Sequence, residues 1–278
     1  MEARQPFSRL GWALFAQMAV MLAAQWGVLL LARAARPGLL GEPVFLWAAS
    51  VLGAYGLGIP AACLVLRGTA APPAPARRPL GPVRFAALWA GSVGLAYLAN
   101  GATLLLTGLL GRLRGAAVVN PVESIGLYPL PLQLLLAGLI APAAEELLFR
   151  RLLLRRLRPY GERFALVASA LCFGLFHGNL NQFFYAFLLG LVLAELALST
   201  GCLWQAVLLH ALVNLFSILW GWLGGPVVVA GAMVPFRLIP ALLARPDAER
   251  GTWRRFLTSP GVLCFGALSL SLALSYLI

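Results

Sequence analysis

Long apolar runs alternate with short polar stretches along most of this chain. A helix needs roughly 20 residues to cross a bilayer core of about 30 Å. Eight or nine runs approach that length, near residues 10–32, 44–66, 85–110, 131–150, 164–179, 183–200, 203–223, 226–244 and 257–278. The run 226–244 contains Pro235, Arg237 and Pro240 in its middle, so it crosses, re-enters or lies in the interface. The pattern predicts an all-α, polytopic integral membrane helix bundle with eight or nine transmembrane helices.

Breaks in the pattern divide the chain into three parts. Residues 1–129 contain three N-terminal transmembrane helices and a proline-rich cytoplasmic linker at 67–84. Residues 130–225 form a helical core that holds most of the polar residues found inside apolar runs. Residues 226–278 contain the re-entrant or transmembrane segment and a final helix.

Composition and charge support a membrane protein and argue against nucleic acid as a partner. Apolar residues make up 61% of the chain and charged residues 11%, against about 45–50% and about 25% in soluble domains. The net charge is +12, and all 21 basic residues are arginine. The arginines cluster in short loops, 67–84 and 150–163 above all, rather than along one polar face. We expect a multi-pass protein of the bacterial inner membrane whose N-terminus and arginine-rich loops are cytoplasmic.

Two adjacent glutamates, Glu145 and Glu146, lie inside the apolar run 131–150 and precede Arg150. Residues four apart share a helix face, whereas neighbours point about 100° apart. The spacing predicts an internal ion pair between Glu146 and Arg150 and leaves Glu145 free as an acid or base. The alternative is that both glutamates belong to a cytoplasmic helix end beside the arginine run.

Both histidines of the chain, His177 and His210, lie in apolar helices. His210 shares a helix face with Asn214, four residues later. A carboxylate and an imidazole on one water could deprotonate it for attack on a carbonyl, while a second histidine and an asparagine stabilise the oxyanion. Alternatively, Glu145, His177 and His210 could hold a divalent metal such as zinc, with an open position for the nucleophilic water. The residues alone leave both mechanisms open.

Two non-catalytic functions also remain open. The same side chains could be interhelical hydrogen-bond partners in a membrane scaffold or bacteriocin-immunity protein, or proton carriers in a proton-coupled transporter. The scaffold hypothesis predicts that each side chain bonds to a different neighbour, whereas the enzyme hypothesis predicts that all face one cavity.

The depths of the two histidines do not match if both helices are straight spans. At about 1.5 Å per residue, His177 lies about 21 Å along its helix from Arg163, whereas His210 lies only about 13 Å from Gly201. Either the helix near 164–179 is short and begins deep, or the loop at 199–203 is recessed.

Three ordered motifs resemble those of the CPBP family of intramembrane endopeptidases, also called Abi or CAAX-protease and bacteriocin-processing proteins. The motifs are Glu145-Glu146-x-x-x-Arg150, Phe173-x-x-x-His177 and His210-x-x-x-Asn214, and the likeness covers about residues 130–220. It implies hydrolysis of a peptide bond in a membrane-anchored protein or peptide by Glu145, His177, His210 and Asn214, with Glu146 and Arg150 in support. Bacterial relatives are associated with peptide maturation, bacteriocin immunity and the processing of C-terminal sorting tails. The family is often labelled metalloprotease, and a metal-free glutamate mechanism is also argued for it.

Overall fold

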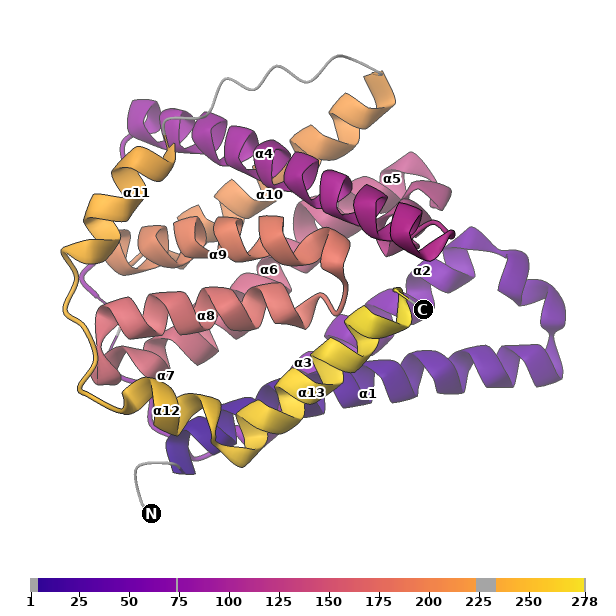
Figure 1. Ribbon diagram of the computed structural model, residues 1–278. Helices are drawn as coiled ribbons and strands as arrows, with labels where there is room; N and C mark the ends of the chain where they lie inside the picture. The colour runs from indigo at the N-terminus through magenta and orange to yellow at the C-terminus, as the bar shows by residue number, and fades with distance from the viewer. Residues whose placement is uncertain (1–4, 74, 224–233, 278) are drawn as a thin grey trace.

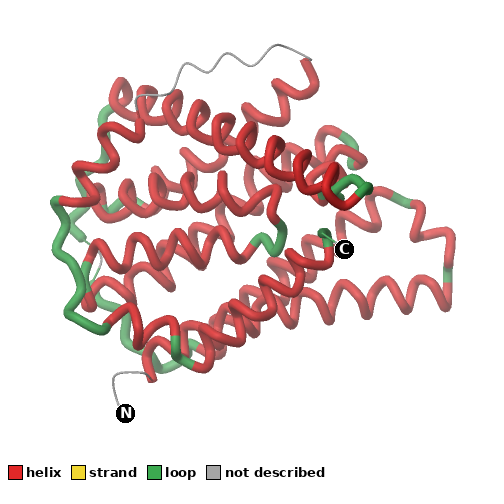
Figure 2. The backbone as a smooth tube through the Cα atoms, viewed as in Figure 1, coloured by secondary structure: helices red, strands yellow, loops and turns green. Residues whose placement is uncertain are grey.

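The computed structural model describes residues 5–73, 75–223 and 234–277, and the regular elements in these ranges are all helices (Figure 1, Figure 2). Six helices of this part are long and apolar enough to cross a membrane. They are α1 (Gln5–Ala35), the helix from α2 to α3 (Pro43–Val65), α4 (Pro82–Arg114), the helix from α5 to η7 (Leu130–Tyr160), α9 (Leu180–Thr200) and α10 (Leu203–Leu223). The protein is therefore an all-helical, multi-pass membrane protein, but the predicted count of eight or nine spans is not confirmed.

The other predicted spans are short helices in the structure. α8 (Glu162–Phe176) has 15 residues and α13 (Pro260–Ser275) has 16. At about 1.5 Å per residue they are about 22–24 Å long, less than the bilayer core of about 30 Å. In the predicted segment 226–244, residues 226–233 lie outside the described residues, and the rest contains α11 (Val234–Leu243). Whether this segment crosses the membrane stays a prediction.

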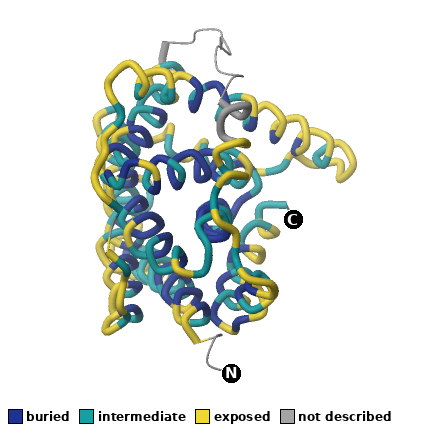
Figure 3. The backbone as a smooth tube through the Cα atoms, turned by 90° about the vertical axis from the view of Figure 1, so that its left-hand side faces the viewer, coloured by how far each residue is buried: buried dark blue, intermediate teal, exposed yellow. Residues whose placement is uncertain are grey.

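The helices lie in layers, with α8 and α9 side by side in the middle (Figure 1). α4 packs across α9 on one side, and α1 and α13 pack together on the other. α10 packs against α6 (Ala141–Glu146), in the middle of the fourth span. Buried residues concentrate in the interior and exposed ones at the periphery (Figure 3). The helices that carry the predicted site residues therefore meet inside the bundle.

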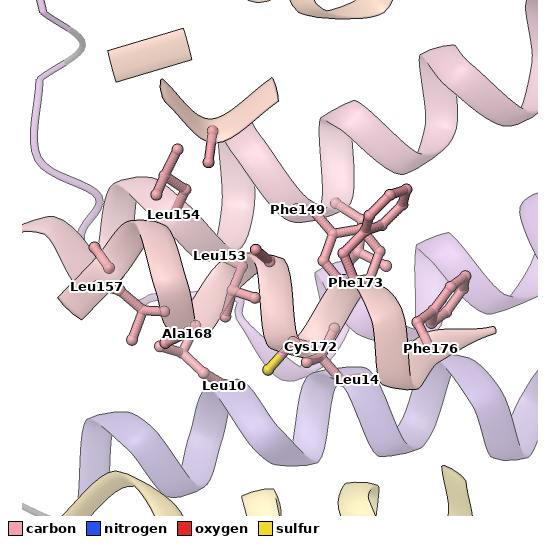
Figure 4. Close-up of a cluster of buried hydrophobic side chains, with 14 of the residues drawn as sticks. Leu10, Leu14, Phe149, Leu153, Leu154, Leu157, Ala168, Cys172, Phe173 and Phe176 are labelled. Carbon is pink, nitrogen blue, oxygen red and sulfur yellow. The ribbon is translucent and has the colours of Figure 1, made fainter. Parts of the chain in front are cut away.

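A cluster of buried apolar side chains joins α1, the fourth span and α8 (Figure 4). Phe149 and Phe173 are at most 1% exposed, and their ring centroids lie 5.0 Å apart in an edge-to-face contact. Lipid tails are as apolar as these side chains, so close packing rather than escape from water holds the helices together here. Since Phe149 precedes Arg150 and Phe173 lies one turn before His177, this packing fixes both polar residues.

His177 and His210 lie at different places in their helices. α8 begins at the arginine-rich end of the bundle and ends at Phe176, so His177 follows its last residue. The turn between α9 and α10 is covered by the linker, because the Arg78 N–H donates to the Thr200 carbonyl at 2.7 Å. Thr200 and Cys202 are only 1% and 2% exposed. The linker therefore covers the turn at 199–203, and α8 is short, as one alternative predicts. The depth of the turn and of α8 in the membrane stays a prediction.

Gly201 allows the linker to lie this close to the turn. Its φ is +63°, a left-handed conformation that favours glycine. A Cβ atom at this position would come within 2.5 Å of the Pro75 carbonyl oxygen and 2.8 Å of the Ala76 carbonyl oxygen. The proline-rich linker therefore packs directly on the helical core.

Three spans of π-helix interrupt the long helices. They are η3 (Leu52–Gly58), η5 (Leu136–Ile140) and η6 (Leu147–Leu154). Pro60 follows η3 and Pro142 follows η5, and proline has no N–H to continue the hydrogen-bond ladder. Such π-turns are often found at functional sites. Two of them, η5 and η6, lie before and after Glu145 and Glu146 in the fourth span.

Arginine side chains join the loops at one end of the bundle. Arg9 donates to the carbonyls of Val65 at 2.8 Å and Arg67 at 2.6 Å, and Arg156 donates to Thr69 Oγ1 at 3.0 Å. The start of α1, the start of the linker and the end of the fourth span therefore lie at the same end.

Arg245 adds the segment after α11 to this end. It donates to both oxygens of Glu195, at 2.6 and 2.7 Å, and to Glu162 at 2.7 Å. The hydrogen bonds to Glu195 raise the pKa of Arg245 above its ordinary value, so Arg245 is a cation at every physiological pH. The arginine-rich stretches thus gather on one side, as the positive-inside rule requires.

Candidate active site

The two adjacent glutamates are buried in the middle of the fourth span. Glu145 is 7% exposed and Glu146 is 0% exposed, and they are the last two residues of α6 before the π-turn η6. A buried carboxylate needs a cationic or hydrogen-bonding partner, because desolvation of an unpaired charge is very costly. Each glutamate has its own set of partners, so the two carboxylates are not equivalent.

Glu146 pairs with Arg150, as the spacing of four predicts. Arg150 Nε donates to Glu146 Oε2 at 2.9 Å, and both side chains are fully shielded from solvent. Arg150 Nη1 donates to Ser169 Oγ at 3.0 Å, and its Cζ atom lies 5.1 Å from the centre of the Phe173 ring. Ser169 donates in turn to the Phe149 carbonyl at 3.0 Å. Glu146 and Arg150 therefore form a fixed unit that also binds α8.

His210 lies between the two carboxylates. Its Nδ1 atom lies 3.1 Å from Glu146 Oε1, a contact that the sequence analysis does not predict. Its Nε2 atom lies 3.9 Å from Glu145 Oε2, too far for a direct hydrogen bond. An Nδ1–H that donates to Glu146 leaves Nε2 of a neutral imidazole as an acceptor. The Nε2 lone pair and the free oxygen of Glu145 then face each other across a short gap.

His177 lies near this gap, but its direct partner is the main chain. The Phe173 carbonyl oxygen lies 2.8 Å from His177 Nδ1, and a carbonyl can only accept, so Nδ1 carries the proton. The Phe173 ring makes edge-to-face contacts with both imidazoles, at 5.0 Å from His177 and 5.7 Å from His210. His177 also interacts electrostatically with Glu145 and with His210. The Phe173 ring therefore contacts both imidazoles, and Glu145 lies beside His210.

Asn214 contacts a main-chain carbonyl rather than the other predicted site residues. Its Nδ2 atom donates to the Ala137 carbonyl at 3.0 Å. The N–H of Ala141 bonds to the Leu136 carbonyl, and Pro142 has no N–H, so neither can bond to Ala137. Asn214 fills this vacancy in the ladder and joins α10 to η5. One of its two amide N–H groups remains for another acceptor.

Tyr55 is a site residue that the sequence analysis missed. Its hydroxyl donates to Glu145 Oε1 at 2.9 Å. The available signal was a tyrosine in the middle of the apolar run 44–66, where a polar tip requires a partner. A second tyrosine, Tyr185, interacts electrostatically with Glu145 and receives a hydrogen bond from Gln182 at 3.2 Å.

A zinc site at Glu145, His177 and His210 is the second mechanism that the residues leave open. In residues 5–73, 75–223 and 234–277, no three His, Cys, Asp or Glu side chains are arranged to hold a metal ion. Glu145 Oε1 accepts from Tyr55, and His177 and His210 each use Nδ1 for another contact, which leaves Glu145 Oε2 and the two Nε2 atoms free. Metal-bound histidines make the same kind of Nδ1 contact, so the zinc site stays a prediction, and we derive no step through a metal.

Buried carboxylates and imidazoles that meet inside a multi-pass helix bundle are rare and mark functional sites, in membrane transporters as well as in membrane enzymes. Comparison with known families gives a more specific result. Residues 128–216 match the family model described as type II CAAX prenyl endopeptidase Rce1-like, a match that confirms the resemblance to the CPBP family and supports a protease. No curated protein and no solved structure matches the chain. The matched stretch contains Glu145, His177, His210 and Asn214 but not Tyr55.

Proposed function

We propose that the protein is an intramembrane endopeptidase that hydrolyses a peptide bond in a membrane-anchored protein or peptide. The observation that carries the proposal is the gap of 3.9 Å between Glu145 Oε2 and His210 Nε2. Two acceptors at this separation can share one bridging water, which donates one hydrogen to each of them. Such a water is held by the groups that can deprotonate it.

In the proposed reaction, the water oxygen attacks the substrate carbonyl carbon while Glu145 takes the water proton. The carbonyl electrons move to oxygen and give a tetrahedral oxyanion. When the intermediate collapses, the carbon–nitrogen bond breaks and the proton passes from Glu145 to the leaving amine. His210 holds the water through Nε2, because Glu146 and Arg150 fix its ring from the other side.

His177 and Asn214 complete the proposed site. Each uses one polar atom to bond to a main-chain carbonyl, and each has a second polar atom that can face a substrate. We assign the free N–H of Asn214 to the oxyanion, a role in which one lost donor typically costs about 10²–10³ in kcat. His177 Nε2 is an acceptor in the neutral ring, and we assign it to a substrate N–H.

We place the arginine-rich end of the bundle, with the N-terminus, in the cytoplasm of a bacterial inner membrane. The family description names a type II CAAX prenyl endopeptidase. In line with what the resemblance to the CPBP family implies, we propose peptide maturation or the removal of C-terminal sorting tails as the activity.

The test is a comparison of protein termini in membrane and secreted fractions from cells with wild-type protein, Glu145→Gln or Glu123→Gln. Glu123 is an exposed glutamate outside the site and provides the matched control. We expect one or more new termini in the wild type and control that are at least about 100-fold less abundant with Glu145→Gln, as removal of a general base predicts. Identical termini in all three strains would refute the proposed function.

A scaffold function is the second candidate, because the four predicted site residues each have a different hydrogen-bond partner, as the scaffold hypothesis predicts. The contact of Asn214 with the Ala137 carbonyl also joins two helices, as an interhelical hydrogen-bond partner does. It predicts that alanine at Glu145, His177 or His210 lowers the melting temperature and changes no protein terminus.

A further inference from the structure

Glu145 is held by a residue from the N-terminal helices. The Tyr55 hydroxyl donates to Glu145 Oε1 at 2.9 Å across 90 positions of sequence. The other carboxylate oxygen, Oε2, faces His210 Nε2. A carboxylate with one oxygen fixed in this way cannot rotate freely about its terminal bond, so the contact determines where Oε2 points.

The main chain around Tyr55 is fixed by α1. Gln17, which is 0% exposed, donates through Nε2 to the Ala54 carbonyl at 3.1 Å. Two glycines let the helices approach closely: a Cβ at Gly53 would lie 2.9 Å from the Gln25 side chain, and one at Gly58 would lie 3.0 Å from Gln17. The π-turn η3 therefore lies directly on α1 and presents Tyr55 to the fourth span.

We propose that Tyr55 is a positioning residue that aims the Glu145 carboxylate at the attacking water. This inference rests on the proposed function of Glu145. Tyr55 lies outside the stretch that matches the family, residues 128–216. It acts through Glu145, so its loss lowers the rate of the chemical step and leaves substrate binding unchanged.

The first experiment compares Tyr55→Phe with Tyr97→Phe in full-length, detergent-solubilised protein. Tyr97 packs its ring against Phe216 and lies outside the site. The substrate is a fluorogenic peptide that spans the cleavage site found by the comparison of termini. Hydrogen bonds to charged groups contribute about 1.5–3 kcal/mol, which corresponds to a factor of about 10–100 in rate. We expect Tyr55→Phe to lower kcat by about this factor, with KM equal to that of Tyr97→Phe.

The second experiment requires no substrate. We measure the melting temperature of wild type, Tyr55→Phe, Glu145→Met and the double variant. If Tyr55 acts through its bond to Glu145, Tyr55→Phe changes the melting temperature only where Glu145 is present. A tyrosine that serves packing alone would have the same effect in both backgrounds.

Three results would overturn the proposal: kcat within twofold of the control, a loss confined to KM, or additive melting temperatures. A Tyr55→Phe protein that fails to fold also refutes it, because Tyr55 would then be a structural residue. If Glu145→Gln is inactive and Tyr55→Phe fully active, the proposed function stands and only this inference fails.

Discussion

The ion pair between Glu146 and Arg150 allows a quantitative test of how the site is built. Both side chains are fully shielded from solvent and their charged atoms lie 2.9 Å apart. Arg150→Met leaves the Glu146 carboxylate with His210 as its remaining partner, and Glu146→Gln leaves a buried guanidinium with Ser169 and the Phe173 ring. Removal of one partner from a buried pair costs about 3–5 kcal/mol, so we expect each single variant to lose this much free energy of unfolding.

The double variant separates charge pairing from packing. The double variant Glu146→Gln/Arg150→Met removes both charges of the pair, and the glutamine oxygen can still accept from His210. We expect the free energy of unfolding of the double variant to be at least about 1 kcal/mol higher than that of the less stable single variant. The free energy of unfolding is measured by detergent titration in mixed micelles, with Arg151→Met as the exposed control, expected within about 0.5 kcal/mol of wild type. Losses that simply add would show that the two charges do not depend on each other.

Two further predictions test the packing that supports the site. Asn214→Leu is expected to lower the free energy of unfolding by about 1–3 kcal/mol, because the Ala137 carbonyl is left unpaired. In a Pro142→Ala background the restored N–H of residue 142 can reach that carbonyl, so Asn214→Leu should lower the melting temperature by less. An equal loss in both backgrounds would contradict our account of the π-turn η5. Gly261→Ala is expected to lower the melting temperature by several degrees, because a Cβ atom there would overlap the main chain of α1. A Cβ atom at Gly266 would meet open space, so the control Gly266→Ala should melt like wild type. Equal melting temperatures of the two variants would contradict the close contact of α1 with α13.

Contacts within one helix were predictable from the sequence. The spacing of Glu146 and Arg150 predicts their pairing, and the pair forms although the π-turn η6 begins directly after Glu146. The long apolar runs predict the six long helices, with boundaries that differ by a few residues, except that the fourth continues past residue 150 to Tyr160. The run 164–179 also predicts α8 to within a few residues at each end, and α8 ends at Phe176 because the chain turns at Gly178, where φ is +60°.

Contacts between distant helices were not predictable from one sequence. His210 bonds to Glu146 across 64 positions and Tyr55 to Glu145 across 90. Both contacts depend on the crossing geometry of three helices, which the hydrophobic pattern does not determine. The contact of Asn214 with Ala137 depends on a vacancy in the ladder, and Pro142 within a helical run was its only visible sign.

The two groups that face each other across the proposed water site are held by different parts of the chain. His210 is fixed by Glu146 and Arg150, which belong to the stretch that matches the family. Glu145 is fixed by Tyr55, which belongs to the N-terminal helices, and Gln17 of α1 bonds to the adjacent main chain. The gap of 3.9 Å is therefore set by the packing of the N-terminal helices on the fourth span as well as by the motifs themselves. Since a displacement of about 1 Å from productive geometry can cost about 10²-fold in rate, a change that loosens α1 from η3 should affect catalysis even though it touches no motif residue.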